Sequence, residues 1–374
     1  MMRVYADHAA TTQLDTDAFE AMKPFLLNEF GNPSQPYSFA RTAKAALKFA
    51  RATIAKCINA DPEEIYFTSG GTESDNWAIK STVLVVGDNR TTITSQIEHH
   101  AVLHACRAME RMGFPVVYLP VDSGGVVQPD VLTEHIGSST KLVSIMYANN
   151  EIGSIQPLKE LCEITHSKGA LFHTDAVQAI GHIPVDVKEL NIDMLSASAH
   201  KFNGPKGIGF LYLKKGTQVA PYADGGAQEF GMRAGTENVA SIVAMAVALE
   251  KNCNRMISVN TQLKELEKCL ISLLKYAGLD FIRNGNFHRI PGNISLSFRG
   301  SDGEMLLHRL DLMGISVSTG SACDSENTQI SHVLEAIHVP KEYAKGTIRI
   351  SLGYENTKEE ITHIAECLIK ILKH

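Results

Sequence analysis

Short runs of apolar and β-branched residues alternate with longer helical patterns between residues 63 and 215. Each run has the length and residue types of a β-strand. The predicted strands are 64–68, 91–94, 116–119, 141–147, 170–173, 194–197 and 209–213. Regular alternation of strand and helix is typical of a largely parallel sheet with helices on both faces. We therefore expect an α/β domain with about seven strands.

Helical periodicity flanks this alternating region on both sides. Residues 38–60 are predicted to form one helix, with apolar side chains on one side and a basic stripe on the other. We interpret the stripe as a solvated face, and docking of an acidic partner is the less favoured alternative. Beyond the sheet, the pattern predicts an alanine-rich helix over 236–251 and a separate polar helix over 259–276.

From about residue 280 the regular alternation ends, which indicates a second, smaller α+β domain. Its predicted elements are strands at 293–298, 315–318 and 347–352, a helix at 304–310, and a C-terminal helix. Thr357 and Glu360 have capping-box spacing at the start of that last helix. We expect residues 13–257 to form the large domain, and residues 1–12 together with 258–374 to form the small one.

Composition excludes several classes of protein. The 374 residues include 35 basic and 41 acidic side chains, a net charge of −6, so nothing suggests direct binding to nucleic acid. The longest nearly apolar run, 240–249, is too short to span a bilayer. Asp7 and His8 stand where a secretory signal would be apolar. We predict a cytoplasmic protein without a membrane segment.

The seven cysteines are scattered, odd in number and never in C-x-x-C spacing, which argues against disulfides and a zinc ribbon. Cys323 differs from the others because it lies in a small, polar, glycine-containing stretch at 316–327 that is not typical of a core. It is the one cysteine that we expect to take part in chemistry.

Ligands of open α/β sheets bind outside the carboxyl ends of the strands, so the residues after each strand matter most. Gly70, Gly71 and Thr72 follow the first strand and suit a phosphate, or form only a tight turn. His100 and His104 share a helix face after the second, but no third ligand is evident and we predict no metal site. Residues 148–153 form a polar loop or cap the next helix.

Two further strand ends carry charge. Asp175 is either a helix cap or the counter-charge of a bound cation. Lys201 lies between a strand of small residues and a Gly-Pro loop, a position that suits a Schiff-base amine. A phosphate turn, a histidine able to stack, an acid and a lysine at one sheet edge together match the needs of pyridoxal phosphate.

Ten short motifs run along the chain from residue 5 to the C-terminal region. They are YADHAATT (5–12), GNPS (31–34), FTSGGTESDN (67–76), NNEIG (149–153), HTDAVQ (173–178), SAHK (198–201), GPKGIG (204–209), MRAGT (232–236), GSAC (320–323) and IRISLG (348–353). In this order and spacing they resemble the motifs of cysteine desulfurases, pyridoxal phosphate enzymes of the class V aminotransferase family. The resemblance implies fold type I, an α/β architecture with a large domain on a mostly parallel seven-stranded sheet and a smaller α+β domain.

The resemblance also implies a role for each matching residue. Lys201 would carry the cofactor and move the substrate α-proton, and His99 would stack on the cofactor ring. Asp175 would pair with the ring nitrogen and Gln178 with the phenolic oxygen. The phosphate would be held by Gly71, Thr72, Ser198 and His200, and by Thr236 of a second subunit in a homodimer. Asn150 and Arg349 would bind the substrate carboxylate, with Asn150 also next to the cofactor.

The resemblance assigns Cys323 the part of the nucleophile. It would take sulfur from L-cysteine as a persulfide, leave L-alanine, and pass the sulfur to an acceptor protein. The Cys loop, at about 318–331, is similar in length to that of the branch serving iron–sulfur cluster assembly and tRNA thiolation. A selenocysteine lyase, a desulfinase, an aminotransferase or a scaffold with little activity are the alternatives. Tyr37 and Ile330 depart from the family pattern, in which a histidine and often a proline stand there.

Overall fold

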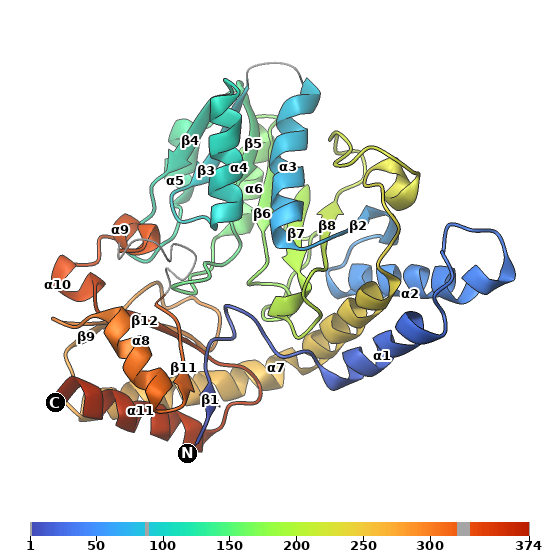
Figure 1. Ribbon diagram of the computed structural model, residues 1–374. Helices are drawn as coiled ribbons and strands as arrows, with labels where there is room; N and C mark the ends of the chain where they lie inside the picture. Colours follow the sequence, from blue (N-terminus) through green and yellow to red (C-terminus); the bar gives the residue numbers. More distant parts are fainter. Residues whose placement is uncertain (1, 87–89, 320–329, 374) are drawn as a thin grey trace.

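A seven-stranded sheet forms the centre of the large domain in the computed structural model, which describes residues 2–86, 90–319 and 330–373 (Figure 1). In spatial order its strands are β2 (Ile65–Thr68), β8 (Gly209–Leu213), β7 (Met194–Ser198), β6 (Leu171–Asp175), β5 (Thr140–Ser144), β3 (Thr91–Ser95) and β4 (Val116–Leu119). β8 runs antiparallel to both of its neighbours, and the other adjacent pairs are parallel. The predicted mostly parallel α/β sheet of seven strands is confirmed.

Helices cover both faces of this sheet, as the alternating pattern predicts. On one face, Trp77 and Val102 pack against Leu142 and Met194 of the strands. The helices of that face are α3 (Gly71–Val86) and α4 (His100–Arg111). The opposite face is covered by α2 (Arg41–Cys57), α5 (Pro129–His135), α6 (Leu158–Ser167) and the start of α7 (Val239–Tyr276), and α1 (Thr16–Leu27) packs on α7.

The long helix α7 corrects the sequence interpretation. We expected two helices, over 236–251 and 259–276, but the structure has one helix of 38 residues. The intervening stretch is polar but contains neither glycine nor proline, so nothing in it interrupts the backbone hydrogen bonds. The Asn252 amide is used within the fold, since it donates to the carbonyl oxygens of Phe202 and Ala248.

The helix α7 also crosses the predicted domain boundary at 257/258 (Figure 1). Met245 and Leu249, in its first half, belong to the core that covers the large sheet. Leu266 and Leu270, in its second half, belong to a separate core formed with the C-terminal region. The helix therefore connects the two cores, and the exact domain limits stay a prediction.

The C-terminal region is built on a small antiparallel sheet in the order β12, β10, β9, beside a parallel pair of β1 and β11. These strands are β12 (Thr347–Ser351), β10 (Asn293–Phe298), β9 (Phe281–Arg283), β1 (Val4–Tyr5) and β11 (Ile315–Ser316). The α-helices described in this region are α8 (Gly303–Leu312), α9 (His332–Ala336), α10 (Lys341–Ala344) and α11 (Lys358–Lys373). Among the described residues of the whole chain, the 3-10 helices are η1 (Ser38–Ala40), η2 (Pro62–Glu64), η3 (Ala199–Lys201) and η4 (Gln228–Gly231).

Local signals at the ends of this region agree with the sequence. The predicted capping box is present, because Thr357 N–H donates to Glu360 Oε2 and Glu360 N–H donates to Thr357 Oγ1. Asp7 bridges to Ser351 of β12, which attaches the N-terminal segment to the small sheet. In the part of the chain that the structure describes, no helix is long and apolar enough to cross a bilayer.

Candidate active site

A cavity of about 300 Å³ lies where the carboxyl ends of β5, β6 and β7 meet the start of α3, the N-terminal segment and β12. This volume is in the range of small-molecule sites, roughly 300–1,000 Å³. The sequence-predicted residues that line it are Gly71, Thr72, His99, Asn150, Asp175, Gln178, Ser198, His200, Lys201 and Arg349. The fold thus brings together residues that are up to 278 positions apart, from 71 to 349.

Lys201 enters the cavity from η3, directly after β7. Its Nζ donates to the carbonyl oxygens of Ala9, at 2.6 Å, and Ala10, at 2.9 Å. Gln178 Nε2 donates to the same Ala9 oxygen at 2.9 Å. The N-terminal segment therefore holds the amine at the cavity wall, in a position to react with a bound aldehyde.

The start of α3 forms the end of the cavity that suits a phosphate. A Cβ on Gly71 would lie 2.5 Å from Val177 Cγ2, so only glycine fits where the chain turns into the helix. The first N–H groups of this 16-residue helix point toward its N-terminal end, where an anion is stabilised. Burial lowers the pKa of His200 to about 4, with Lys201 adding to the effect, so His200 meets a ligand as a neutral imidazole.

Asp175 and His99 also line the cavity. Burial raises the pKa of Asp175 to about 6, against the opposing effects of a hydrogen bond from Val177 N–H at 2.9 Å and of the Lys201 charge. Burial, and then Lys201, lower the pKa of His99 to about 4. His99 Nδ1 accepts from Ala101 N–H at 3.2 Å and so caps α4, which fixes the neutral ring against the cavity.

Arg349 and Asn150 line the cavity as well. The Arg349 side chain, 5% exposed, donates through Nη2 to Asp7 Oδ1 at 2.7 Å and through Nη1 to the Asn150 carbonyl oxygen at 3.1 Å. Its Nε is buried and has no hydrogen-bond partner among the described residues. A guanidinium with donor capacity left inside a cavity suits a carboxylate ligand.

The residues fit pyridoxal phosphate. The glycine turn at the start of α3 leaves the backbone open to a phosphate, Lys201 supplies an amine, and Asp175 supplies a carboxyl that a ring cation would keep ionised. The neutral ring of His99 is available for stacking.

Comparison with known proteins agrees with this fit. A profile of the aminotransferase class V family matches residues 4–364. The chain is 49% identical over 372 residues to the cysteine desulfurase IscS of Dictyoglomus turgidum, covering 99% of this chain and 94% of the relative. It is 40% identical to the cysteine desulfurase NifS of Azotobacter vinelandii, covering 97% of this chain and 91% of the relative. The chain belongs to the cysteine desulfurase family.

Solved structures of related proteins have the same fold as this chain. A NifS-like protein, 39% identical, matches with a TM-score of 0.94 and complete coverage of both chains. A structure of SspA in complex with cysteine, 34% identical, matches with a TM-score of 0.84 over 95% of this chain and 100% of the other. The predicted family, the fold-type I architecture and the pyridoxal phosphate cofactor are therefore confirmed.

Two predicted residues of the desulfurase site need separate comment. Cys323 and most of its loop lie outside the described residues. Thr236 is exposed in the segment before α7, and none of the cavity lining comes from it. The roles of both stay predictions, as do the individual roles of the lining residues.

The sequence interpretation did not predict two acidic residues of the site. Asp7 pairs with Arg349, and Asp75 lines the cavity from the first turns of α3. Asp75 lies inside the quoted motif 67–76, and its signal was an acidic residue in a helix with an otherwise small or apolar face. Asp7 lies inside the quoted motif 5–12, but its partner Arg349 is 342 positions away, so the sequence did not indicate the ion pair.

Three other histidines form a cluster beside the site. The His100 ring centroid lies 5.1 Å from that of His104 and 5.0 Å from that of His332. Within the described residues, no group of three His, Cys, Asp or Glu side chains has an arrangement that could hold a metal ion. Of the two departures from the family pattern, Tyr37 is exposed and Ile330 packs against a small apolar cluster, and neither lines the cavity.

Proposed function

We propose that this protein is a cysteine desulfurase that converts L-cysteine to L-alanine and retains the sulfur as a persulfide on Cys323. The observation that carries the proposal is that Lys201, Asp175 and Arg349 line one cavity. An amine, a ring counter-charge and a carboxylate receptor together suit an enzyme that acts on an amino acid with pyridoxal phosphate. The family relationship supports cysteine as the substrate.

Bound pyridoxal phosphate supplies an electron sink that makes the substrate α-proton acidic. The protein's own residues do the rest. Arg349, oriented by Asp7, binds the substrate carboxylate and so fixes which face of the amino acid meets Lys201. Lys201, once its amine is free of the cofactor, accepts the α-proton. His99 stays neutral and packs against the ring without adding charge.

Cys323 then takes the sulfur. Its thiolate attacks the sulfur atom of the bound cysteine, so a sulfur–sulfur bond forms while the bond between that sulfur and Cβ breaks. The electron pair of the broken bond stays on the carbon, where a proton completes the methyl group of alanine. The sum is L-cysteine plus thiol giving L-alanine plus persulfide, and it requires no external oxidant or reductant.

The proposal includes a homodimer in which Thr236 completes the phosphate site of the other subunit. Thr236 is exposed and lies six residues after Phe230, a side chain that is 60% exposed. Phe39 and Phe49, 54% and 71% exposed, lie close along the chain at η1 and in α2, and Arg51 of α2 stacks over the Phe230 ring. Thr236 does not line the cavity of its own subunit, and exposed aromatic side chains lie near it in the sequence. Both observations support burial of this face by a second copy of the chain.

We further propose that the persulfide passes, in the cytoplasm, to an acceptor protein of iron–sulfur cluster assembly or of a thiolation pathway. The names of the relatives support the desulfurase step and leave several acceptors possible.

The test uses purified, cofactor-loaded protein with three substrates: L-cysteine, L-selenocysteine and cysteine sulfinate. We expect alanine from L-cysteine with the wild type and with the control Cys269→Ser. Cys323→Ser should keep its yellow colour but lose alanine formation from L-cysteine, while the two substrates with better leaving groups still react. Unchanged turnover of L-cysteine by Cys323→Ser would exclude the persulfide role. Turnover of the other two substrates alone by the wild type would favour a lyase or desulfinase.

A further inference from the structure

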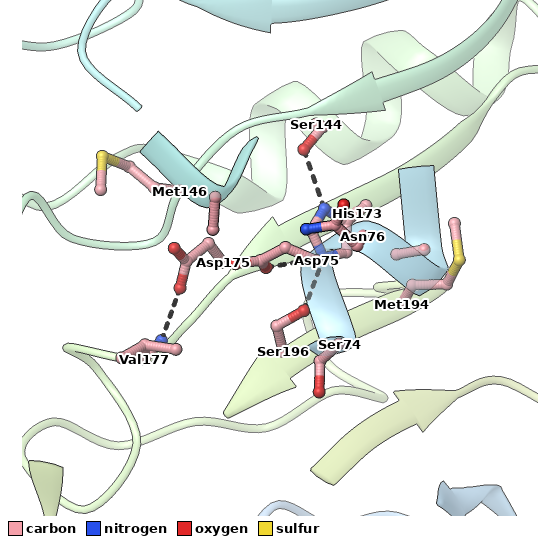
Figure 2. Close-up of polar contacts among 12 residues, drawn as sticks. Ser74, Asp75, Asn76, Ser144, Met146, His173, Asp175, Val177, Met194 and Ser196 are labelled. Carbon is pink, nitrogen blue, oxygen red and sulfur yellow. Dashed lines mark hydrogen bonds and ion pairs between the residues drawn. The ribbon is translucent and has the colours of Figure 1, made fainter. Parts of the chain in front are cut away.

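Beneath the cavity, the face of the sheet toward α3 changes from apolar to polar along the strands. Alternate residues of a strand share a face, so Ser144, His173 and Ser196 of three adjacent strands lie on this face and form a polar layer. In the register of the sheet, Ser144 is opposite His173, and Ser196 is opposite Asp175. The His173 ring lies between the two hydroxyls, with Nδ1 2.8 Å from Ser144 Oγ and Nε2 3.0 Å from Ser196 Oγ (Figure 2). Asp175, two residues further along β6 than His173, lines the cavity.

Asp75 of α3 packs onto this polar layer and also lines the cavity. Its side chain is 1% exposed. Oδ1 lies 3.7 Å from His173 Nε2, and in the described part of the chain it has no hydrogen-bond partner. The ionisable groups that influence or face Asp75 are His173 and Asp175 on β6 and Glu98 in the segment before α4. Within that same part of the chain, no lysine or arginine forms an ion pair with it.

This environment disfavours a charge on Asp75. A buried carboxylate without a cation is costly, so such a group keeps its proton instead. His173 cannot supply the cation, because burial lowers its pKa to about 3 and both ring nitrogens already face serine hydroxyls. In agreement, burial raises the pKa of Asp75 well above its usual value, with the Asp175 carboxyl as the next cause.

Asp175 differs from Asp75 in ways that favour its ionised form. It accepts the Val177 N–H at 2.9 Å (Figure 2). The Lys201 charge also acts on it. Two carboxyls that influence each other this closely share their protons unequally. The cation of a ring nitrogen would stabilise the Asp175 carboxylate further, whereas a second negative charge nearby would oppose it.

We propose that Asp75 is a positioning residue that works as a neutral, protonated carboxyl, so that Asp175 is the single negative charge facing the cofactor's ring nitrogen. This inference rests on the proposed pyridoxal phosphate site. It predicts that an amide can replace the Asp75 carboxyl but not the Asp175 carboxyl, because only the first is already uncharged.

The first test compares cofactor affinity of Asp75→Asn, Asp75→Ala and Asp175→Asn, measured from the visible absorbance during titration with pyridoxal phosphate. Asp75→Asn should bind within about threefold of the wild type, and Asp175→Asn should bind at least about tenfold more weakly, a difference of about 1.4 kcal/mol. Asp75→Ala should also bind more weakly, since it removes the side-chain hydrogen bond between Asp75 and Ser196 and leaves a gap against the polar layer. A loss in Asp75→Asn as large as that in Asp175→Asn would overturn the proposal.

The second test reads the charge of Asp75 directly by infrared spectroscopy of the holoenzyme. A protonated carboxylic acid has a carbonyl band separate from the carboxylate bands. We expect part of this band at neutral pH to disappear in Asp75→Asn, and Glu98→Gln to remove a different part. An unchanged band in Asp75→Asn would show that Asp75 is ionised and would overturn the inference. Failure of the proposed function would give a different result. The wild type would then bind no pyridoxal phosphate, while the carboxylic acid band would still show whether Asp75 is protonated.

Discussion

The buried acid Glu98 gives a sharp prediction about stability. Its side chain is fully buried directly before His99, with Oε1 2.5 Å from Ser95 Oγ and both oxygens 3.0 Å from Met146 N–H. Burial raises the pKa of Glu98 to about 8, and the hydrogen bonds from Ser95 and Met146 oppose the rise only in part. Glu98 is therefore a neutral carboxyl when it holds the end of β5 beside the cofactor cavity.

The sign of the pH dependence follows from the two states of the chain. In the unfolded chain Glu98 ionises near pH 4.5, whereas in the native protein it stays protonated up to about pH 8. Its contribution to stability is thus fully present below pH 4.5 and is lost progressively as the pH rises to about 8. At about 1.4 kcal/mol per pH unit, the loss over this interval is about 5 kcal/mol.

The variant Glu98→Gln should lack this loss, because an amide is neutral at every pH and can still accept the Met146 N–H. Urea unfolding at pH 5, 6.5 and 8, at one protein concentration, measures the free energy of unfolding of variant and wild type. Between pH 5 and 8, the free energy of unfolding of the variant should increase by several kcal/mol relative to that of the wild type. The control Glu163→Gln changes an exposed acid on α6 and should show no such trend. A constant difference between Glu98→Gln and the wild type would refute the reasoning.

Three further predictions concern the cavity. Lys201→Ala should abolish the visible absorbance of bound cofactor, while the exposed Lys206→Ala keeps it, and an unchanged spectrum in Lys201→Ala would exclude the lysine assignment. Asp7→Asn should raise KM for L-cysteine about tenfold with less effect on kcat, because a charge-assisted hydrogen bond of about 1.5–3 kcal/mol no longer orients Arg349. Steady-state kinetics measure both constants, and an unchanged KM would contradict this prediction. Mixed dimers of Lys201→Ala and Thr236→Val subunits should regain about half of the wild-type activity if Thr236 serves the other subunit. Activity no higher than that of the parent dimers would place Thr236 in its own subunit's site or in none.

Much of the fold could be predicted because strands and helices leave a local pattern. All seven strands of the large sheet follow from runs of apolar and β-branched residues, and the C-terminal capping box follows from Thr357 and Glu360. The continuity of α7 could not be predicted from the sequence. The polar residues around Asn252 suggest a break in the helix as long as their buried hydrogen-bond partners are unknown.

The candidate site shows the same division. Lys201 and Asp175 could be predicted, because each lies at the carboxyl end of a strand, at the edge where ligands bind. The role of Asp75 depends on the register of three strands against one helix, and the partnership of Asp7 with Arg349 joins two ends of the chain. These relations arise from packing. The small or apolar helix face around Asp75 marks the residue, but the neighbouring residues do not indicate its partners or those of Asp7.

The most direct test of the account is a single-turnover reaction of the holoenzyme with L-cysteine, without an acceptor or reductant. We predict about one alanine per subunit and a mass increase of about 32 Da, one sulfur atom, on the peptide that contains Cys323. The peptides of Cys57 and Cys253, two partly buried thiols, should stay unmodified. Alanine formed without added mass on the Cys323 peptide, or at the same rate by Cys323→Ser, would contradict the proposed mechanism.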